Sequence, residues 1–167
     1  MVQESIRFFC PDGRELHFSD TIAEITSFVS KDAKRMHKVI VGSDSSVFGL
    51  EPFQSSIITV IIVWRVGKGA TYFWTRSRPQ TFYTLRDRII REAMESLTLA
   101  QEVRSRLVKE LGSEFLWDGN EVHVDIGEVG ESRVFIKEVT GLIRGFDFIP
   151  VIKPEAWCAS TVADRHT

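Results

Sequence analysis

Residues 38–46 read KVIVGSDSS, a short apolar run that ends in glycine, serine and aspartate. An apolar run of this length, bounded by small polar residues, is typical of a buried strand, which we predict over 38–43. Asp44 follows that strand directly. Ligands of open α/β sheets bind in the crevice beyond the carboxyl ends of the strands, so Asp44 is a candidate functional residue. The alternative is an aspartate that merely suits a turn or a helix cap.

The residues beyond Asp44 predict an alternation of strands and helices. Apolar residues at spacings of three, four and seven predict a long helix that Gly112 ends. The predicted elements are strands over 56–66 and 70–76, the helix over 85–111, a strand over 121–126, a helix over 132–144, a strand over 146–153 and a short helix over about 159–166. This order predicts an α/β fold, with a mixed five-stranded sheet and helices on both faces.

The first 35 residues predict a small extension that packs on the core domain, which we place at 36–167. Two strands, over 6–10 and 15–18, are joined by a turn at Pro11-Asp12-Gly13. A short helix follows over 22–29. The extension is therefore expected to be a β-hairpin and a helix.

Composition limits the classes of function. The chain has 167 residues, 43% of them hydrophobic, and a net charge of -2, so nucleic acid would have to be bound through a local patch or through metal ions. Two distant cysteines, Cys10 and Cys158, argue against a disulfide framework and a zinc site. No signal-peptide pattern is seen, and the apolar run at 57–64 is too short to span a bilayer. We expect a cytoplasmic protein that is not bound to a membrane.

Carboxylates occur where the predicted sheet would gather them. Asp125 ends the strand over 121–126, and it lies close to Asp44 if the two strands are parallel neighbours. Paired carboxylates repel each other, and a divalent cation such as Mg²⁺ or Mn²⁺ relieves the repulsion. Asp164, in the last predicted helix, is a third candidate. Two ions about 4 Å apart would clamp a scissile phosphate.

The long helix offers a fourth carboxylate. Glu92 and Glu95 are the candidates, and Asp87 is a weaker one. Glu92 adjoins the apolar stripe of the helix. Each of these residues could equally be a solvated charge on the helix surface.

Several segments together resemble the YkuK-type proteins, a bacterial family with a ribonuclease H-like fold. The segments are VGSDSS (41–46), the Gly-Lys-Gly hairpin (67–69), RIIREAMESLTLA (88–100), HVDIGEVG (123–130) and AWCASTVADRHT (156–167). The resemblance covers about residues 38–167. It implies a two-metal phosphodiester nuclease that uses Mg²⁺ or Mn²⁺. Its metal-binding and catalytic residues would be Asp44, Glu92, Asp125 and Asp164, with Glu95 as the rival of Glu92.

Other residues admit a functional and a structural interpretation. His123 shares a strand face with Asp125, but we expect a hydrogen-bonded strand residue. His166 lies near Asp164 and could assist the reaction. In Tyr72-Phe73-Trp74, alternation puts at least one side in the core. Five arginines could steer phosphate or form a solvated face: Arg76, Arg78, Arg86, Arg88 and Arg91.

The leading hypothesis is a nuclease that acts on RNA, an RNA–DNA hybrid or structured DNA. A catalytically inactive module that binds nucleic acid or a protein partner is the alternative. A third hypothesis takes VGSDSS as the phosphate-binding turn of an actin-like ATPase. It ranks last because that branch needs a second domain and a second glycine-rich loop.

Overall fold

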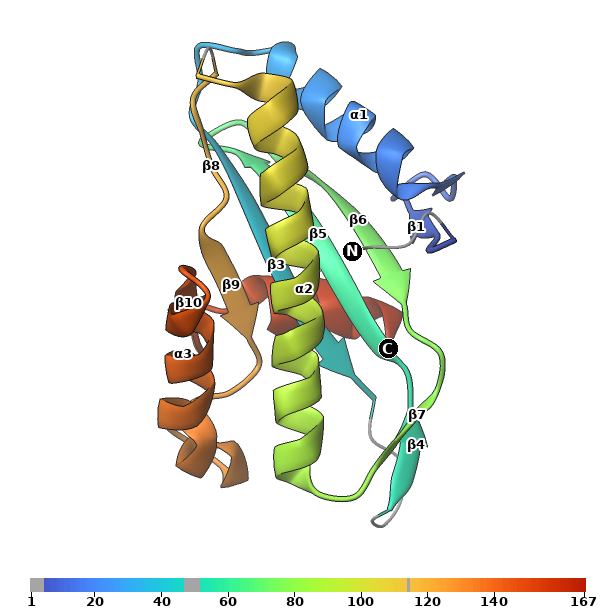
Figure 1. The fold of residues 1–167 in the computed structure, drawn as a ribbon, viewed down its shortest axis with the longest axis vertical. Coiled ribbons are helices and arrows are strands. Elements are labelled where there is room, and N and C mark those ends of the chain that lie inside the picture. The colour runs from blue at the N-terminus through green and yellow to red at the C-terminus, as the bar shows by residue number, and fades with distance from the viewer. Residues whose placement is uncertain (1–4, 47–51, 114) are drawn as a thin grey trace.

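The computed structural model describes residues 5–46, 52–113 and 115–167. Its main sheet contains β1 (Phe8–Phe9), β2 (Glu15–Leu16), β3 (His37–Ser45), β5 (Ile57–Arg65), β6 (Ala70–Arg76), β8 (Trp117–Asp118), β9 (Glu121–Val124) and β10 (Ile149–Val151). Seven of these eight strands lie in the order β10-β9-β3-β5-β6-β1-β2, and β8 pairs with β3 (Figure 1). β3 is central and reaches Ser45, so Asp44 lies inside the strand. The sequence had predicted that Asp44 follows the end of the strand.

The sheet combines an antiparallel and a parallel half, as predicted. β3 and β5 are antiparallel from His37↔Arg65 to Ser45↔Ile57, and β5 and β6 form the next antiparallel pair. On the other side β9 runs parallel to β3, and β10 runs parallel to β9. The predicted α/β class with a mixed sheet is therefore confirmed.

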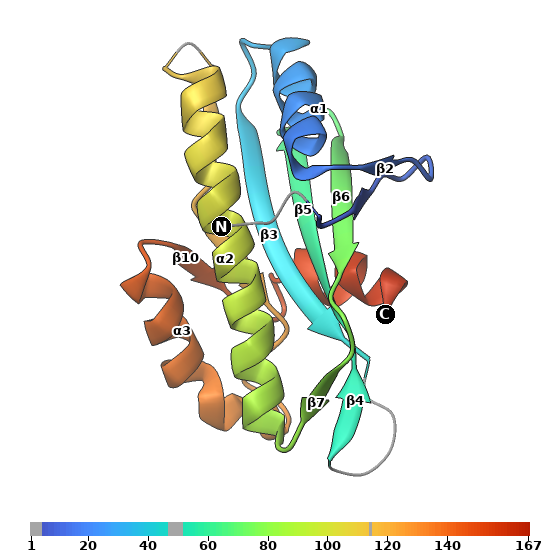
Figure 2. The same cartoon turned by 45° about the vertical axis from the view of Figure 1, so that its right-hand side comes forward.

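The predicted number of five strands is too small. β1 pairs with β6 through Phe9↔Trp74 and brings β2 with it, so the N-terminal hairpin continues the main sheet. An edge strand leaves backbone N–H and C=O groups unpaired, and a neighbouring strand can pair with them. β4 (Phe53–Ser55) and β7 (Gln80–Phe82) form a separate two-stranded ribbon, which Figure 2 shows extending beyond the main sheet. These short pairings carry little sequence pattern of their own.

Helices cover both faces of the sheet. α1 (Phe18–Ser30), α2 (Leu85–Leu111) and α3 (Ile136–Gly145) pack on one face, and the short η1 (Glu131–Phe135) precedes α3. The opposite face carries η2 (Cys158–Ala163), a π-helix, and η3 (Asp164–His166), a 3₁₀ turn; the red segment in Figure 1 is this part of the chain. The single final helix that we predicted is thus two short turns.

Alternation along β3 divides the core into two layers. Val39 and Val41 pack in the cluster with α2, whereas Ile40 packs with Cys158 and Ala163 of η2. Ser43 and Ser45 continue the first face, and Asp44 continues the second, because neighbouring side chains of a strand point to opposite faces. The end of β3 thus presents polar groups to both layers.

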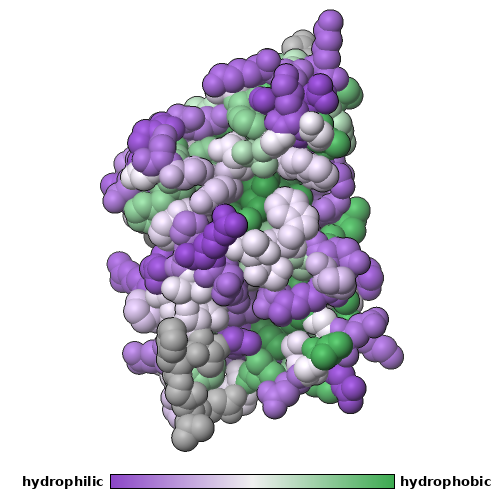
Figure 3. Space-filling model, turned by 180° about the vertical axis from the view of Figure 1, so that it is seen from behind, coloured by the Kyte–Doolittle hydropathy of each residue, from purple (hydrophilic) through white to green (hydrophobic). Residues whose placement is uncertain are grey.

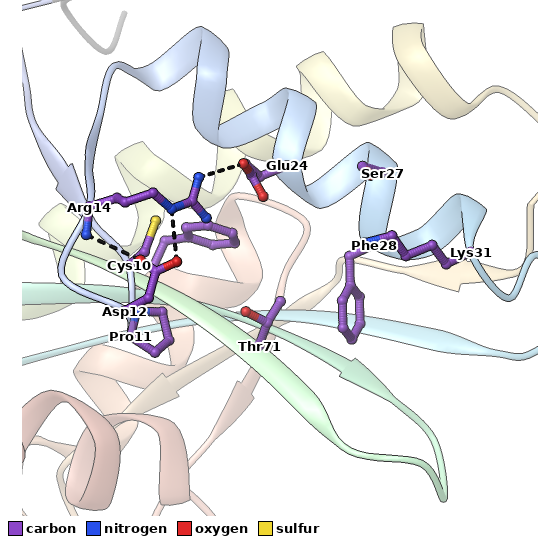
Figure 4. A pocket seen from close by; sticks show the side chains of 10 residues that line it. Cys10, Pro11, Asp12, Arg14, Glu24, Ser27, Phe28, Lys31 and Thr71 are labelled. Atoms are coloured by element: carbon purple, nitrogen blue, oxygen red, sulfur yellow. Dashed lines mark hydrogen bonds and ion pairs between the residues drawn. The ribbon is translucent and has the colours of Figure 1, made fainter.

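The N-terminal segment is attached to the core by packing, and ion pairs join its own hairpin to α1. Phe8 and residues of α1 join the main core cluster. Arg14 lies 2.8 Å from Asp12 and 2.9 Å from Glu24 of α1, beside a cavity of about 220 Å³ that Figure 4 shows. Exposed ion pairs such as these contribute little stability, so the buried Phe8 is the main anchor. The boundary that we placed at residue 35 stays a prediction.

Candidate metal centre

Asp44 and Asp125 occupy neighbouring positions at the ends of two parallel strands. Ser43 of β3 pairs with Val124, the last residue of β9; Asp44 follows Ser43 within β3, and Asp125 directly follows β9. Val124 packs in the α2 layer, so both aspartates point to the opposite face, where η2 lies. The predicted parallel neighbours are therefore present, and they bring these two carboxylates together.

The environment of Asp44 disfavours its charged form. The pKa of Asp44 is raised to about 6, chiefly by burial and also by the negative charges of Asp125 and Asp164, against the lowering effect of the Ser45 amide and Arg88. Asp164 is the exposed first residue of η3. Three carboxylates therefore act on one another across the face that η2 covers.

Glu92 approaches from the other layer. Its side chain is buried and accepts a 2.6 Å hydrogen bond from the Ser45 hydroxyl. Arg88 lies 3.8 Å from the same carboxylate. The pKa of Glu92 is raised to about 8, chiefly by burial and in smaller part by Asp44 and Asp125, while Arg88 and Ser45 oppose the rise. Glu92 thus lies within electrostatic reach of both aspartates.

Glu95 points elsewhere. Its carboxylate is half-buried and lies 3.5 Å from the Gln80 amide nitrogen, on the side of α2 toward β7. The structure therefore brings Glu92, and not Glu95, beside Asp44. Residues three apart project from neighbouring parts of the helix surface, about 60° apart around the axis, and their different partners, Ser45 and Gln80, show that the two side chains diverge.

Asp125 already has a cationic neighbour. The Lys153 ammonium nitrogen lies 3.0 Å from Asp125 Oδ1. That oxygen is buried and makes no hydrogen bond of good geometry with any described residue. Over residues 5–46, 52–113 and 115–167, no group of three or more histidines, cysteines, aspartates or glutamates is close enough to hold a metal ion. The carboxylates are neighbours, but their oxygens do not converge.

The donor set nevertheless suits a hard divalent cation. All four candidates offer carboxylate oxygens, the ligands that Mg²⁺ and Mn²⁺ prefer. Burial chiefly raises the pKa values of Asp44 and Glu92, and neighbouring carboxylates contribute, so a bound cation would stabilise the charged form of both groups. Among the described residues, Asp125 Oδ1 makes no hydrogen bond of good geometry and is held by the Lys153 ion pair alone, so a cation could take the place of that ammonium group. These residues therefore fit such an ion.

A hydroxyl network holds α2 against β3. The Ser43 and Thr59 hydroxyls are 2.9 Å apart, and Ser96 donates to Ser43 at 2.8 Å. All three side chains are buried. Ser96 lies one helical turn after Glu92, so this network helps to fix the glutamate. Sequence analysis missed Thr59 and Ser96, because a serine or threonine within an apolar pattern gives no signal of its partner.

His123 is a structural residue, as predicted. It is buried, its Nδ1 accepts a hydrogen bond from the Cys158 amide at 3.3 Å, and its Nε2 lies 3.4 Å from Glu121. Burial lowers the pKa of His123, so the ring is neutral. Gly42, beside His123, lets η2 pack closely against β3, because a Cβ at this position would lie only 3.1 Å from the Ala159 nitrogen. These contacts place η2, and hence Asp164, over β3.

His166 is held in place at the end of the chain. Its ring stacks on Trp74 at a centroid distance of 4.3 Å, and its carbonyl accepts a hydrogen bond from Arg76. Burial lowers the pKa of His166, and Arg165 and Arg76 lower it further. The His166 ring therefore packs on the sheet beside Trp74.

The predicted arginine cluster is largely paired. Arg86 pairs with Glu138, Arg88 lies near Glu92, and Arg91 lies 4.0 Å from Asp87. Arg78 is exposed and has no ion pair with a described residue. Most of this set therefore follows the solvated-face interpretation, and Arg76 and Arg78 remain near the end of β6.

Comparisons with known proteins agree with the fold. The chain matches the family described as Ribonuclease H-like over residues 20–167. It is 30% identical over 177 aligned positions to the Bacillus subtilis (strain 168) protein titled "Uncharacterized protein YkuK", with 98% of each chain covered. No solved structure gives a significant match. No helix of the described residues is long and apolar enough to cross a membrane.

Proposed function

This chain belongs to the ribonuclease H-like family, and from that membership and its carboxylates we propose that it is a divalent-metal-dependent nuclease. It would hydrolyse phosphodiester bonds in RNA, an RNA–DNA hybrid or structured DNA. The observation that carries the proposal is the pairing of β3 with β9, which makes Asp44 and Asp125 neighbours on one face. A fold alone does not determine a function, so the argument depends on these carboxylates.

The proposed ligands come from four elements. Asp44 and Asp125 would bind the cation from neighbouring strands, Glu92 from α2 and Asp164 from η3. Bound Mg²⁺ or Mn²⁺ would activate water and stabilise the leaving oxygen. Ser45 orients Glu92 by its hydrogen bond, and burial of Glu92 excludes water from that side of the cluster. Lys153 neutralises part of the charge of Asp125 and would give way to the cation.

The free thiols are compatible with the cytoplasm, which we include in the proposal. Cys10 and Cys158 are both buried and unpaired. Disulfides are rare in a reducing compartment.

Cleavage assays with each substrate class test the proposal. Single-stranded RNA, an RNA–DNA hybrid and a DNA hairpin are incubated with the protein in Mg²⁺, in Mn²⁺ and in EDTA. We expect cleavage only with metal, and its loss in Asp44→Asn and Asp125→Asn with unchanged circular dichroism. Asp20→Asn, at an exposed position on α1, is the control and retains activity. Full cleavage by both site variants would contradict the proposal.

One observation favours the alternative of an inactive binding module. Lys153 lies beside Asp125, and among the described residues the carboxylate oxygens do not converge into a metal-binding group. If Lys153 permanently occupied the place of the cation, the protein could bind nucleic acid but could not hydrolyse it. Binding of substrate with no cleavage in either metal would support this alternative.

A further inference from the structure

A groove of about 870 Å³ lies where β1, the end of β6 and α2 meet. Its lining includes Arg7 and Phe9 of the N-terminal segment, Arg76 and Arg78 at the end of β6, and Gln80 and Glu95. The N-terminal wall precedes residue 20, where the match to the family begins. One side of the groove is therefore built by residues outside that match, and its other sides by residues within it.

The groove is positively charged within a chain of net charge -2. Among its described lining residues are three guanidinium groups, those of Arg7, Arg76 and Arg78, and one carboxylate, that of Glu95. Arg7 contacts the His17 ring, and Arg76 donates to the His166 carbonyl, so neither charge is cancelled by a carboxylate in these contacts. Arg78 is exposed and has no ion pair with any described side chain. A local excess of this kind attracts an anionic ligand.

The groove adjoins the carboxylate centre. Asp44 pairs with Ile58 across β3 and β5, and Ile58 pairs with Arg76 across β5 and β6. Two strand spacings separate Asp44 from Arg76, which is about 10 Å. Directly paired residues of neighbouring strands point to the same face, so Asp44 and Arg76 share the face that carries η2. A ligand that followed this face from Arg76 could therefore reach Asp44.

The chemistry of the lining favours a phosphate backbone. Guanidinium groups bind phosphate oxygens in a bidentate manner, and the Gln80 amide adds neutral hydrogen-bonding capacity. The Trp74 ring is already stacked on Phe9, at 4.5 Å, and on His166, so it is not free to anchor an apolar side chain. Figure 3, which views the molecule from behind, shows hydrophobic residues in separate patches among hydrophilic ones. A partner that needs a broad apolar surface fits poorly.

We propose that this groove binds the sugar–phosphate backbone of single-stranded nucleic acid and leads the strand to the carboxylate centre. A concave groove admits one strand, whereas a duplex presents its phosphates on a convex surface. That the bound nucleic acid leads to the carboxylate centre rests on the proposed nuclease function, but binding in the groove does not. Because the contacts are to the backbone, binding tolerates any base sequence and weakens with salt.

The test is fluorescence anisotropy with the full chain in EDTA, which separates binding from cleavage. The probes are a labelled single-stranded RNA, the single-stranded DNA of the same sequence and the duplex DNA. We expect both single strands to bind more tightly than the duplex. Arg78→Ala should weaken binding about five- to tenfold and reduce the salt slope by about one. Glu95→Gln should tighten binding, because it removes the negative charge.

Arg86→Ala is the matched control, since Arg86 is exposed but pairs with Glu138 outside the groove. It should bind as the wild type does. Arg7→Ala is compared only if its thermal midpoint is unchanged, because Arg7 contacts His17. Unlabelled RNA should displace the probe, and poly-glutamate of equal charge should not.

Three results would overturn the inference. They are unchanged affinity in Arg78→Ala, tighter binding of the duplex, and displacement by poly-glutamate as effective as by RNA. Weaker binding in Arg78→Ala together with full cleavage by Asp44→Asn would support the groove and contradict the nuclease centre. Loss of cleavage in Asp44→Asn together with unchanged binding by Arg78→Ala would support the nuclease centre and contradict the groove.

Discussion

The Ser45 hydroxyl donates a 2.6 Å hydrogen bond to the buried carboxylate of Glu92, and this bond joins the last residue of β3 to α2. Asp44, one residue earlier, points to the opposite face of the sheet. The end of one strand therefore organises carboxylates from both layers of the fold. It also separates Glu92 from Glu95, whose partner is Gln80.

Glu92→Gln should reduce Mn²⁺ affinity and abolish metal-dependent cleavage, because an amide is a poorer cation ligand than a carboxylate. The fold should remain intact, since the amide is neutral and retains an oxygen that can accept from Ser45. Isothermal titration with MnCl₂ measures the affinity. Glu95→Gln is the matched control and should keep wild-type metal affinity. Equal losses in the two variants would refute the assignment of Glu92.

Asp44→Asn should stabilise the metal-free protein at neutral pH. The folded-state pKa of Asp44, about 6, exceeds its ordinary value of 3.8. The folded state therefore holds the proton more tightly, and the stability that this group contributes below about pH 4 is lost as the pH rises through about 6. A shift of roughly two units limits the gain in Asp44→Asn to about 3 kcal/mol at pH 7.5.

Urea unfolding in EDTA at pH 4, 5, 6 and 7.5 checks this dependence. The difference in the free energy of unfolding between Asp44→Asn and the wild type should grow over that range and then level off. Asp20→Asn should show a smaller, flat difference. A difference that did not change with pH would mean that Asp44 is not destabilised in the folded chain.

Lys153→Gln should bind Mn²⁺ several-fold more tightly than the wild type. The Lys153 ammonium nitrogen is 3.0 Å from Asp125, so it competes with a cation for the same oxygen. Lys38→Gln is the control, because Lys38 forms a comparable ion pair with Glu121 at 2.6 Å. Titration calorimetry compares the three proteins. Weaker binding in Lys153→Gln would show that the lysine supports the site instead of competing with the metal.

Gly42→Ala should destabilise the protein by about 1–3 kcal/mol, because an inserted methyl group overfills a closely packed contact. The added Cβ would lie 3.1 Å from the Ala159 nitrogen, the Cys158 sulfur and the His123 carbonyl oxygen. Two of these are backbone atoms and yield little. Asp164 directly follows η2, so a displacement of η2 would move this proposed ligand and should lower the metal affinity as well.

Gly141→Ala provides the comparison, because Gly141 lies in α3 with open space where a Cβ would stand. It should stabilise the protein by about 0.5–1 kcal/mol, since alanine favours a helix more than glycine does. Urea unfolding measures both variants. A Gly42→Ala protein as stable as the wild type would show that η2 moves away from β3 at little cost.

Much of the architecture could be predicted because the local spacing of apolar residues determines it. The helix over 85–111 agrees with α2 at both ends, since Thr84 caps it and Gly112 ends it with a positive φ of 59°. Alternation also predicted that at least one side of residues 72–74 is core: Phe73 lies in the main core cluster, and Tyr72 and Trp74 pack on the other face. These features depend on neighbours within a few residues.

The remaining features depend on contacts between distant segments. β1 joins the sheet through the single pair Phe9↔Trp74, which no local pattern announces. The final helix divides into η2 and η3 as the chain packs closely over Gly42.

The sequence by itself determined the mixed α/β sheet and the candidate carboxylates Asp44, Asp125 and Asp164, because strand and helix periods place residues on a face. Only the tertiary structure decided that Glu92 rather than Glu95 lies beside Asp44, and that Lys153 stands next to Asp125. The physical reason is that these contacts join elements whose relative rotation and distance are determined by packing. The period of the apolar residues predicts which face of a helix or strand is buried, but packing decides which side chains of two neighbouring elements come into contact.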